Sequence, residues 1–282
     1  MNSYYKIKHV TKAELDIIMG WAAKEKWNPG LHDAFAFYAT DPTGFFIGYL
    51  NDIPISCISA VSYSDEFGFI GFYIVKSQYR GKGYGIQIWN KALEYLKNRN
   101  IGLDGVLTQQ ENYKQSGFKL AHKNIRFKHK IVKNMTSQQN IISLDKVNFA
   151  DLISYDSTLF PVNRKTFIKN WINLPESTGL AYIDDKKIMG YGLIRKCEIG
   201  YKIGPLFSNN EDVAEKLYLN LTNSVKSNSL VYLDIPEVNT KALKLVKKYN
   251  MIPIFETARM YTREIPQIDL NMIYGITTFE LG

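Results

Sequence analysis

The stretch Phe67–Asn98, FGFIGFYIVKSQYRGKGYGIQIWNKALEYLKN, decides the fold of the first half of the chain. Its first nine residues, Phe67–Val75, are apolar on both faces, which predicts a central strand of a sheet. A glycine-rich segment follows at Gln78–Gly85. The apolar residues after it recur at helical spacing, at Ile86, Trp89, Leu93 and Leu96. The predicted order is therefore strand, glycine loop, helix.

The glycine loop, QYRGKGYG at 78–85, has the composition of an anion-binding turn. Glycines let the backbone approach a ligand and turn its N–H groups toward one point, and the helix that follows adds its positive end. Arg80 and Lys82 add positive charge, so a pyrophosphate is the expected occupant. The loop matches neither the Walker pattern nor the dinucleotide fingerprint, which requires an acidic residue about 20 positions further on.

Composition and length indicate a globular protein. The 282 residues are 45% hydrophobic and 22% charged, which is enough for a sizeable core and for two domains. The longest apolar stretch is far shorter than the roughly 20 residues of a membrane span, and Met1–Val10 lacks the apolar core of a signal peptide. We therefore expect a soluble, cytoplasmic protein with no membrane partner, in which Cys57 and Cys197 are buried free thiols.

The net charge of +8 is concentrated in the first half. Residues 1–134 carry 18 Lys and Arg against 11 Asp and Glu, whereas residues 135–282 carry 17 against 16. The first half is therefore expected to bind the anionic ligand. Nucleic acid is one candidate, but no zinc spacing, basic helix or RNP-like aromatic pattern accompanies the charge, and a small polyphosphate fits equally well. We rank nucleic-acid binding last and expect no nucleic acid among the partners.

The second half repeats the first in weakened form. Residues 180–194 have the hairpin pattern of residues 45–63, and KKYNM at 247–251 lies opposite KQSGF at 114–118, at a constant offset of 133. The polar segment Met135–Asn140 is the natural linker. These features predict two copies of one α/β fold, over residues 1–134 and 135–282.

The glycine loop, the preceding Tyr73-Ile-Val75 and the later Asn112-Tyr113-x-x-x-Gly117-Phe118 together resemble the GNAT superfamily of acetyl-CoA-dependent N-acetyltransferases. The resemblance covers residues 1 to about 130. The second half is similar to the smaller C-terminal GNAT-like domain of a tandem-domain bacterial subgroup. The resemblance implies two tandem domains, each a mixed, mostly antiparallel twisted sheet flanked by helices, with a catalytic first domain and a degenerate second one.

The resemblance also implies which residues bind coenzyme A. The loop holds the pyrophosphate through backbone amides, and the strand ending at Val75 pairs by its main chain with the pantetheine. The implied cofactor-binding residues are Tyr73, Ile74, Val75, Gln78, Arg80, Gly81, Lys82, Gly83, Tyr84, Gly85, Asn112 and Tyr113.

The corresponding positions of the second half lack these features. Opposite the glycine loop stands IGPLFSNN at 203–210, where Pro205 removes a backbone donor and no basic residue occurs. Opposite Tyr113 stands Val246, which has no proton to donate. We therefore expect one cofactor site, in the first half, with the second half supplying a wall of the acceptor site or a packing surface.

Acyl transfer to an amine needs a polarised thioester carbonyl, a neutral amine and a proton for the leaving thiolate. The resemblance places Tyr113 near the cofactor sulfur, and a phenol of pKa near 10 is a suitable donor to a thiolate of pKa about 8.5. The main-chain N–H of Val75 would polarise the carbonyl.

The general base stays open at this point. The family most often uses the position of Glu66, directly or through water, at the mouth of the central strand. The loop after the first helix offers three other candidates for the base, which are Glu25, His32 and Asp33. In the same loop, Trp27 and Asn28 would either shape an acceptor pocket or end the helix.

The leading hypothesis is an N-acetyltransferase that moves an acetyl group from acetyl-CoA directly to a primary amine of a small molecule, with neither metal nor covalent enzyme intermediate. The alternative is a CoA-binding sensor or interaction protein without transferase activity. Replacing Tyr113 by Phe separates them, because loss of the acid slows turnover and leaves cofactor binding nearly intact.

Overall fold

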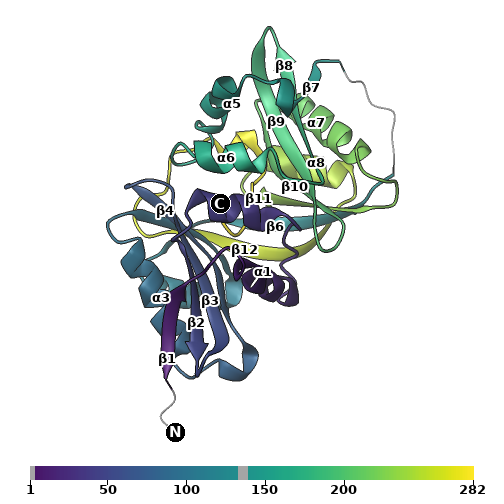
Figure 1. Cartoon of the computed structure of the whole chain (residues 1–282). Helices are drawn as coiled ribbons and strands as arrows, with labels where there is room; N and C mark the ends of the chain where they lie inside the picture. The colour runs from purple at the N-terminus through teal and green to yellow at the C-terminus, as the bar shows by residue number, and fades with distance from the viewer. Residues whose placement is uncertain (1–3, 133–138) are drawn as a thin grey trace.

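The computed structural model describes residues 4–132 and 139–282, in which two similar halves share one continuous sheet (Figure 1). The strands of the first half are β1 (Tyr5–His9), β2 (Phe45–Leu50), β3 (Ile53–Ser62), β4 (Phe67–Val75), β5 (Asn100–Val106) and β6 (Lys119–Lys130). Those of the second half are β7 (Ile141–Ser143), β8 (Ser177–Asp184), β9 (Lys187–Lys196), β10 (Tyr201–Ser208), β11 (Leu230–Pro236), β12 (Ile252–Tyr261) and β13 (Ile273–Gly275).

Helices flank the sheet in both halves. The α-helices are α1 (Leu15–Lys24), α2 (Asp33–Thr40), α3 (Tyr84–Tyr95), α4 (Gln110–Gln115), α5 (Phe149–Asp156), α6 (Lys165–Trp171), α7 (Glu211–Asn223) and α8 (Thr240–Lys248). Short 3₁₀ helices are η1 (Ser77–Tyr79), η2 (Leu107–Gln109), η3 (Leu144–Lys146) and η4 (Leu270–Met272).

Each half is built on the same unit of strand, helix and parallel strand. The stretch predicted to decide the fold forms β4 and α3, after which β5 pairs with β4 in parallel. In the second half β10, α7 and β11 repeat this order, again with a parallel pair. The other strand pairs of the sheet are antiparallel. The predicted mixed, mostly antiparallel α/β architecture in two copies is therefore confirmed.

Two strands are exchanged between the halves, which the sequence did not predict. The path through the sheet runs β1-β2-β3-β4-β5-β12-β6-β11-β10-β9-β8-β7, so β12 of the second half lies beside β5 of the first, and β6 of the first half lies beside β11 of the second. Figure 1 shows β6 and β12 running together between the two halves. Residues 133–138, which include most of the predicted linker 135–140, lie outside the described residues.

Buried contacts reinforce the exchange. Arg126 of β6 and Asp234 of β11 form a two-bond ion pair with N–O distances of 2.7 Å, and both side chains are 2% exposed. On the face covered by α2 and α6, the rings of Phe37 and Trp171 stack at 5.8 Å, within one apolar core that contains residues of both halves. The two halves are therefore joined by packing as well as by strand pairing.

Within the described residues, no helix is both long enough and apolar enough to span a membrane. Cys57 and Cys197 are both free and buried, as predicted.

The ion pair across the exchanged strands gives a stability prediction. Replacing Asp234 by Asn should lower the free energy of unfolding by about 3–5 kcal/mol, because it leaves the buried Arg126 guanidinium without its counter-charge. The measurement is urea denaturation followed by circular dichroism. Asp212→Asn is the control, since it breaks an exposed pair with Lys216 that is worth less than about 1 kcal/mol. Equal losses in the two variants would contradict this account of the interface.

Candidate active site

The parallel strands β4 and β5 separate halfway along their length. Their pairing runs from Phe67 opposite Asn100 to Ile70 opposite Leu103 and then stops, and the remainder of β5 pairs only with β12 on its other side. A pocket of about 810 Å³ opens where the strands diverge. Its walls include Ile70–Val75 of β4 and residues 103–109, which form the end of β5 and the η2 turn after it.

The diverging part of β4 contains a bulge. Ser56 pairs with Val75 and Cys57 with Ile74, but Ser59 pairs with Gly71, so β4 has one extra residue at this point. Phe72 takes a φ of +47°, a left-handed conformation that is rare for a bulky residue and that clusters at functional sites. The buried Cys57 thiol donates to the Phe72 carbonyl at 3.2 Å, and burial raises the pKa of this thiol, so it stays protonated.

The bulge is followed by main-chain groups that face the pocket. The Lys76 N–H donates to Ile55 of β3, and N–H and C=O groups alternate in direction along a strand. The groups of Val75 therefore point away from β3, toward the gap. In agreement, the Val75 carbonyl accepts a hydrogen bond from Arg80 Nε at 2.7 Å.

The glycine loop lies between β4 and α3 at one end of the pocket. Gly81 and Gly83 have φ values of +74° and +81°, and no atom lies within 4 Å of the position that a Cβ would take on either. Gly83 caps α3 and has no side chain to cover the first N–H groups of the helix. Gly85 packs against the Tyr73 hydroxyl, which would lie 2.7 Å from an added Cβ. The loop thus presents free backbone donors at a helix N-terminus, which suits a phosphate group.

The positive side chains of the loop are engaged with protein groups. Besides its bond to Val75, Arg80 pairs with Glu25 at 2.5 Å, and both residues line the pocket. The Lys82 ammonium lies 5.8 Å from the Tyr79 ring. The Arg80–Glu25 pair joins the glycine loop to the end of α1 across the pocket.

Tyr113 lies on the pocket wall beside α3 and β5. It belongs to α4, lines the pocket, and contacts the Trp89 ring with centroids 5.4 Å apart. Gly105 permits this position, because a Cβ there would be 2.2 Å from the Tyr113 ring. Burial raises the pKa of the Tyr113 phenol above its usual value near 10, so the group is a neutral donor at neutral pH.

The structure brings seven of the twelve predicted cofactor-binding residues to the pocket wall: Tyr73, Ile74, Val75, Arg80, Gly81, Gly85 and Tyr113. The other five lie beside it in the loop or on α4: Gln78, Lys82, Gly83, Tyr84 and Asn112. Asn112 is bonded to the Gln109 side chain at 2.7 Å.

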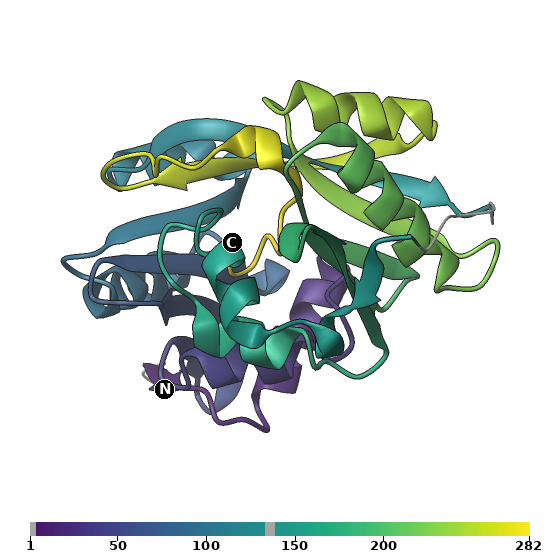
Figure 2. The same ribbon diagram turned by 90° about the horizontal axis from the view of Figure 1, so that it is seen from above.

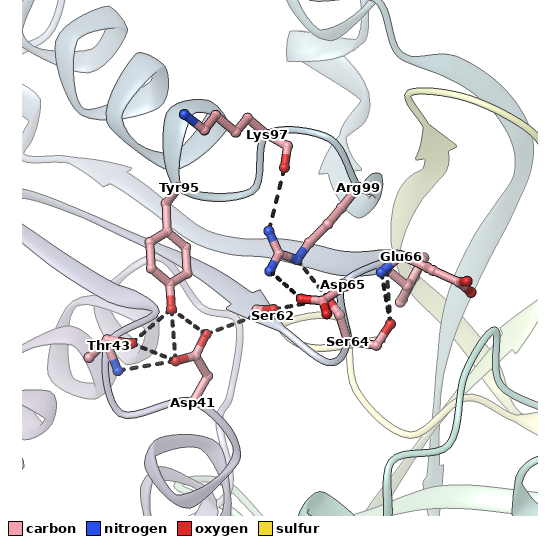
Figure 3. Close-up of polar contacts among 10 residues, drawn as sticks. Asp41, Thr43, Ser62, Ser64, Asp65, Glu66, Tyr95, Lys97 and Arg99 are labelled. Atoms are coloured by element: carbon pink, nitrogen blue, oxygen red, sulfur yellow. Dashed lines mark hydrogen bonds and ion pairs between the residues drawn. The ribbon is translucent and has the colours of Figure 1, made fainter.

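Glu66, the position most often used as the base in the family, is not brought to the pocket. It is exposed in the hairpin before β4, beside Ser64 and the Arg99–Asp65 pair (Figure 3). Ile70, the first pocket residue of β4, is four residues further on, which is roughly 13 Å along a strand. At that separation the Glu66 carboxylate cannot reach a group bound between Val75 and Tyr113.

The predicted acceptor residues divide into one pocket residue and three that join the halves. Trp27 lines the pocket. Asn28 is buried and exchanges hydrogen bonds with the Ile199 backbone, and Asp33 forms a buried ion pair with Arg195 at 2.8 Å. His32 pairs with Glu176 at 3.1 Å near the surface. Asn28, His32 and Asp33 therefore hold the two halves together.

The second half contributes pocket residues that the sequence analysis missed. They are Phe255, Glu256 and Thr257 of β12, and Phe279 and Glu280 of the segment after β13. Their contact with the first half follows from the strand exchange and from the return of residues 276–282 to β4. No local motif marks either event, so only the fold reveals these residues.

The equivalent gap of the second half is filled by the chain itself. There β10 and β11 pair in parallel only from Tyr201 to Ile203, and β13 then pairs with β10 at Leu206 and Phe207. The Ile276 N–H donates to the Asp234 carbonyl of β11 at 2.8 Å. The first turn of α7 is capped by the Asn210 side chain, which accepts from the Val213 N–H. Neither the gap nor the helix end is open to a ligand.

Within residues 4–132 and 139–282 no cluster of three or more His, Cys, Asp or Glu side chains is arranged to hold a metal ion.

Comparison with known proteins agrees with this geometry. Residues 13–118 match the model of the acetyltransferase (GNAT) family, and residues 152–275 match that of an acetyltransferase (GNAT) domain. A holothin acyltransferase from a Pseudoalteromonas strain is 32% identical over 275 residues, which cover 98% of this chain and 94% of the relative. The chain therefore belongs to the GNAT acetyltransferases and has two GNAT domains.

Solved structures show the same fold. A putative acetyltransferase from Pyrococcus horikoshii superposes with a TM-score of 0.83 at 22% identity, covering 99% of this chain and 96% of the other. A tandem GNAT protein from the clavulanic acid biosynthesis pathway gives a TM-score of 0.63 at 10% identity, covering 92% and 98%. At these identities the likeness establishes the fold.

The burial of Tyr113 predicts its behaviour in alkali. Because its pKa is higher in the folded than in the unfolded chain, its contribution to stability is present below pH 10 and is lost as the pH rises above 10. Ultraviolet phenolate titrations of the wild type and of Tyr113→Phe should therefore coincide up to about pH 10.5. A wild-type excess of one phenolate near pH 10 would show that Tyr113 is in open solvent.

Proposed function

We propose that this protein is an N-acetyltransferase that moves an acetyl group from acetyl-CoA to a primary amine of a small molecule. The observation that carries the proposal is the pocket between the separated strands β4 and β5, with an uncapped glycine loop at one end and Tyr113 in its wall. In this proposal residues 1–134 are the catalytic domain, and residues 135–282 are a degenerate copy that helps to enclose the acceptor.

The polar groups of the described pocket residues are complementary to those of acetyl-CoA. The backbone donors of Gly81–Gly85 at the start of α3 are suited to its pyrophosphate. The main chain of Tyr73 to Val75, free of strand partners on one side, is suited to the amides of its pantetheine. Arg80 supports this arrangement by fixing the Val75 carbonyl, and its release from Glu25 would give the pyrophosphate a cationic partner.

Two groups of this chain would act directly in the acetyl transfer. The Val75 N–H faces the gap and would donate to the thioester oxygen as negative charge develops on it. Tyr113 would donate its phenolic proton to the sulfur when the carbon–sulfur bond breaks, because burial keeps the phenol neutral at the working pH. Acetyl-CoA supplies the activated acyl group, and no metal takes part in this scheme.

The enclosure of the pocket favours a small acceptor. Its lining includes Trp27 of the first half and Phe255, Phe279 and Glu280 of the second half. The 32% identical relative is named for acyl transfer to holothin, which is consistent with acyl transfer by this chain.

The first test is a calorimetric titration with acetyl-CoA. We expect one site per chain, and we expect Gly83→Glu to abolish it, because the new carboxylate would stand among the donors intended for the pyrophosphate. Gly117→Glu is the matched control: Gly117 also has a positive φ, +89°, with open space around it, but it lies after α4 and away from the pocket wall. Absence of wild-type binding would overturn the proposal.

The second test separates a transferase from a sensor that only binds CoA. Tyr113→Phe should lower kcat by about 10²- to 10⁴-fold, the range typical of a lost general acid, while the Kd for acetyl-CoA changes little. Release of free CoA thiol with a panel of primary amines measures the rate. If acetyl-CoA binds but the wild type acetylates no amine in the panel, the sensor hypothesis is preferred.

A further inference from the structure

Among the described residues, the pocket wall has one basic side chain, and a carboxylate of the same wall holds it. Arg80 donates through Nε to the Val75 carbonyl at 2.7 Å and through Nη2 to Glu25 at 2.5 Å. Both charged side chains remain in contact with solvent, since 52% of Arg80 and 37% of Glu25 are exposed. The guanidinium is therefore accessible to a ligand, although Glu25 already occupies one of its nitrogens.

The other charged side chains of the described wall are acidic. The wall contains Glu25, Asp104, Glu256 and Glu280, against Arg80 as its basic residue. Glu280 comes from the end of the chain, which Figure 2 shows in the middle of the molecule, between the two halves. An anionic ligand thus meets one cationic side chain in the described wall, and Glu25 neutralises that side chain.

Glu25 stands at a position where a helix disfavours a carboxylate. It is the C-cap of α1, and the C-terminal end of a helix carries a partial negative charge from its unpaired carbonyl groups. The carboxylate is repelled by this end of the helix and is stabilised by a nearby cation. The position of Glu25 is therefore explained by its pairing with Arg80 and not by the stability of α1.

The backbone that carries Glu25 is fixed in place. The Lys26 N–H donates to the Ala23 carbonyl at 3.0 Å, and Lys26 takes a φ of +65°. The Trp27 N–H donates to the Ala22 carbonyl, also at 3.0 Å. These two bonds form the Schellman motif that ends many helices, here with lysine at the position where glycine is favoured. The Glu25 carboxylate is thus held beside the glycine loop at a high effective concentration.

Two anions on the Arg80 guanidinium would repel each other. Glu25 is bonded to Nη2, so a phosphate brought to the same guanidinium would lie close to the Glu25 carboxylate. An exposed ion pair such as Arg80–Glu25 is weak enough to exchange partners. Glu25 and a bound phosphate are therefore expected to pair with Arg80 alternately.

We propose that Glu25 competes with the pyrophosphate of CoA for Arg80, and that this competition speeds the release of CoA after acetyl transfer. The inference rests on the proposed function and adds a residue to its cofactor site. When acetyl-CoA binds, Arg80 exchanges Glu25 for the pyrophosphate. After the transfer, Glu25 pairs with Arg80 again and the CoA product loses its cationic partner. Glu25 touches no reacting atom and acts through Arg80 as a positioning residue.

The experiment compares ligands with and without a pyrophosphate. CoA and pantetheine are each titrated into the whole chain by calorimetry, and the dissociation rate of CoA is measured by stopped-flow tryptophan fluorescence, to which Trp27 and Trp89 of the pocket wall contribute. Glu25→Gln should lower both the Kd for CoA and its dissociation rate by about two- to fivefold, the range of an exposed ion pair. The Kd for pantetheine should not change, because pantetheine has no pyrophosphate to pair with Arg80.

Two further variants separate competition for Arg80 from a general effect of charge. Glu256→Gln removes the same charge from the same wall, but Glu256 pairs with Lys123, so this variant should change the Kd for CoA by less than Glu25→Gln does. In an Arg80→Gln background, Glu25→Gln should no longer tighten CoA binding, because the guanidinium for which the two anions compete is gone.

The sign of the Glu25→Gln effect decides the inference. Unchanged CoA binding would overturn it, and so would weaker binding, which would mean that Glu25 orients Arg80 toward the pyrophosphate. Equal tightening by Glu256→Gln, equal tightening for pantetheine, or an effect that survives Arg80→Gln would also overturn it. In all of these cases CoA still binds the wild type, so the proposed function stands. A wild type that binds neither acetyl-CoA nor CoA would instead refute the proposed function.

Discussion

The separation of β4 from β5 is the constraint on which the rest of this structure depends. Beyond Ile70 and Leu103 the two strands no longer pair, and main-chain groups on the facing edges need other partners. In the first half the edge of β4 faces an open pocket that ends at an uncapped helix. In the second half the same gap is closed by β13 and by the Ile276 N–H. One architecture thus yields an open pocket in one copy and a filled gap in the other.

Because β6 and β12 are exchanged, the second half, whose own gap is filled, still contributes residues to the pocket of the first half. Because β12 lies against β5, its residues Phe255–Thr257 reach the pocket of the first half. After filling its own gap with β13, the chain continues to Phe279 and Glu280 at the same pocket. The closed gap of the second half and its contribution to the pocket of the first half are therefore two results of one path of the chain.

Local signals predicted the parts of the site that depend on local sequence. The glycine loop and the two-faced apolar strand before it could be found because their spacing reports backbone conformation directly, whereas Tyr113 was found through the family resemblance. The strand exchange could not, since β6 and β12 carry ordinary strand patterns and a strand's pattern does not specify its neighbour. For the same reason Asp33 looked like a residue of the substrate loop, whereas the structure pairs it with Arg195 of the second half.

The central claim is that acetyl-CoA occupies the gap of the first half and not that of the second. Hydrogen exchange measured by mass spectrometry, with and without saturating acetyl-CoA, tests it most directly. The account predicts slower exchange in residues 72–86 and 104–113 and no change in residues 203–213, where the main chain is already paired. Protection of residues 203–213, or none in residues 72–86, would contradict it.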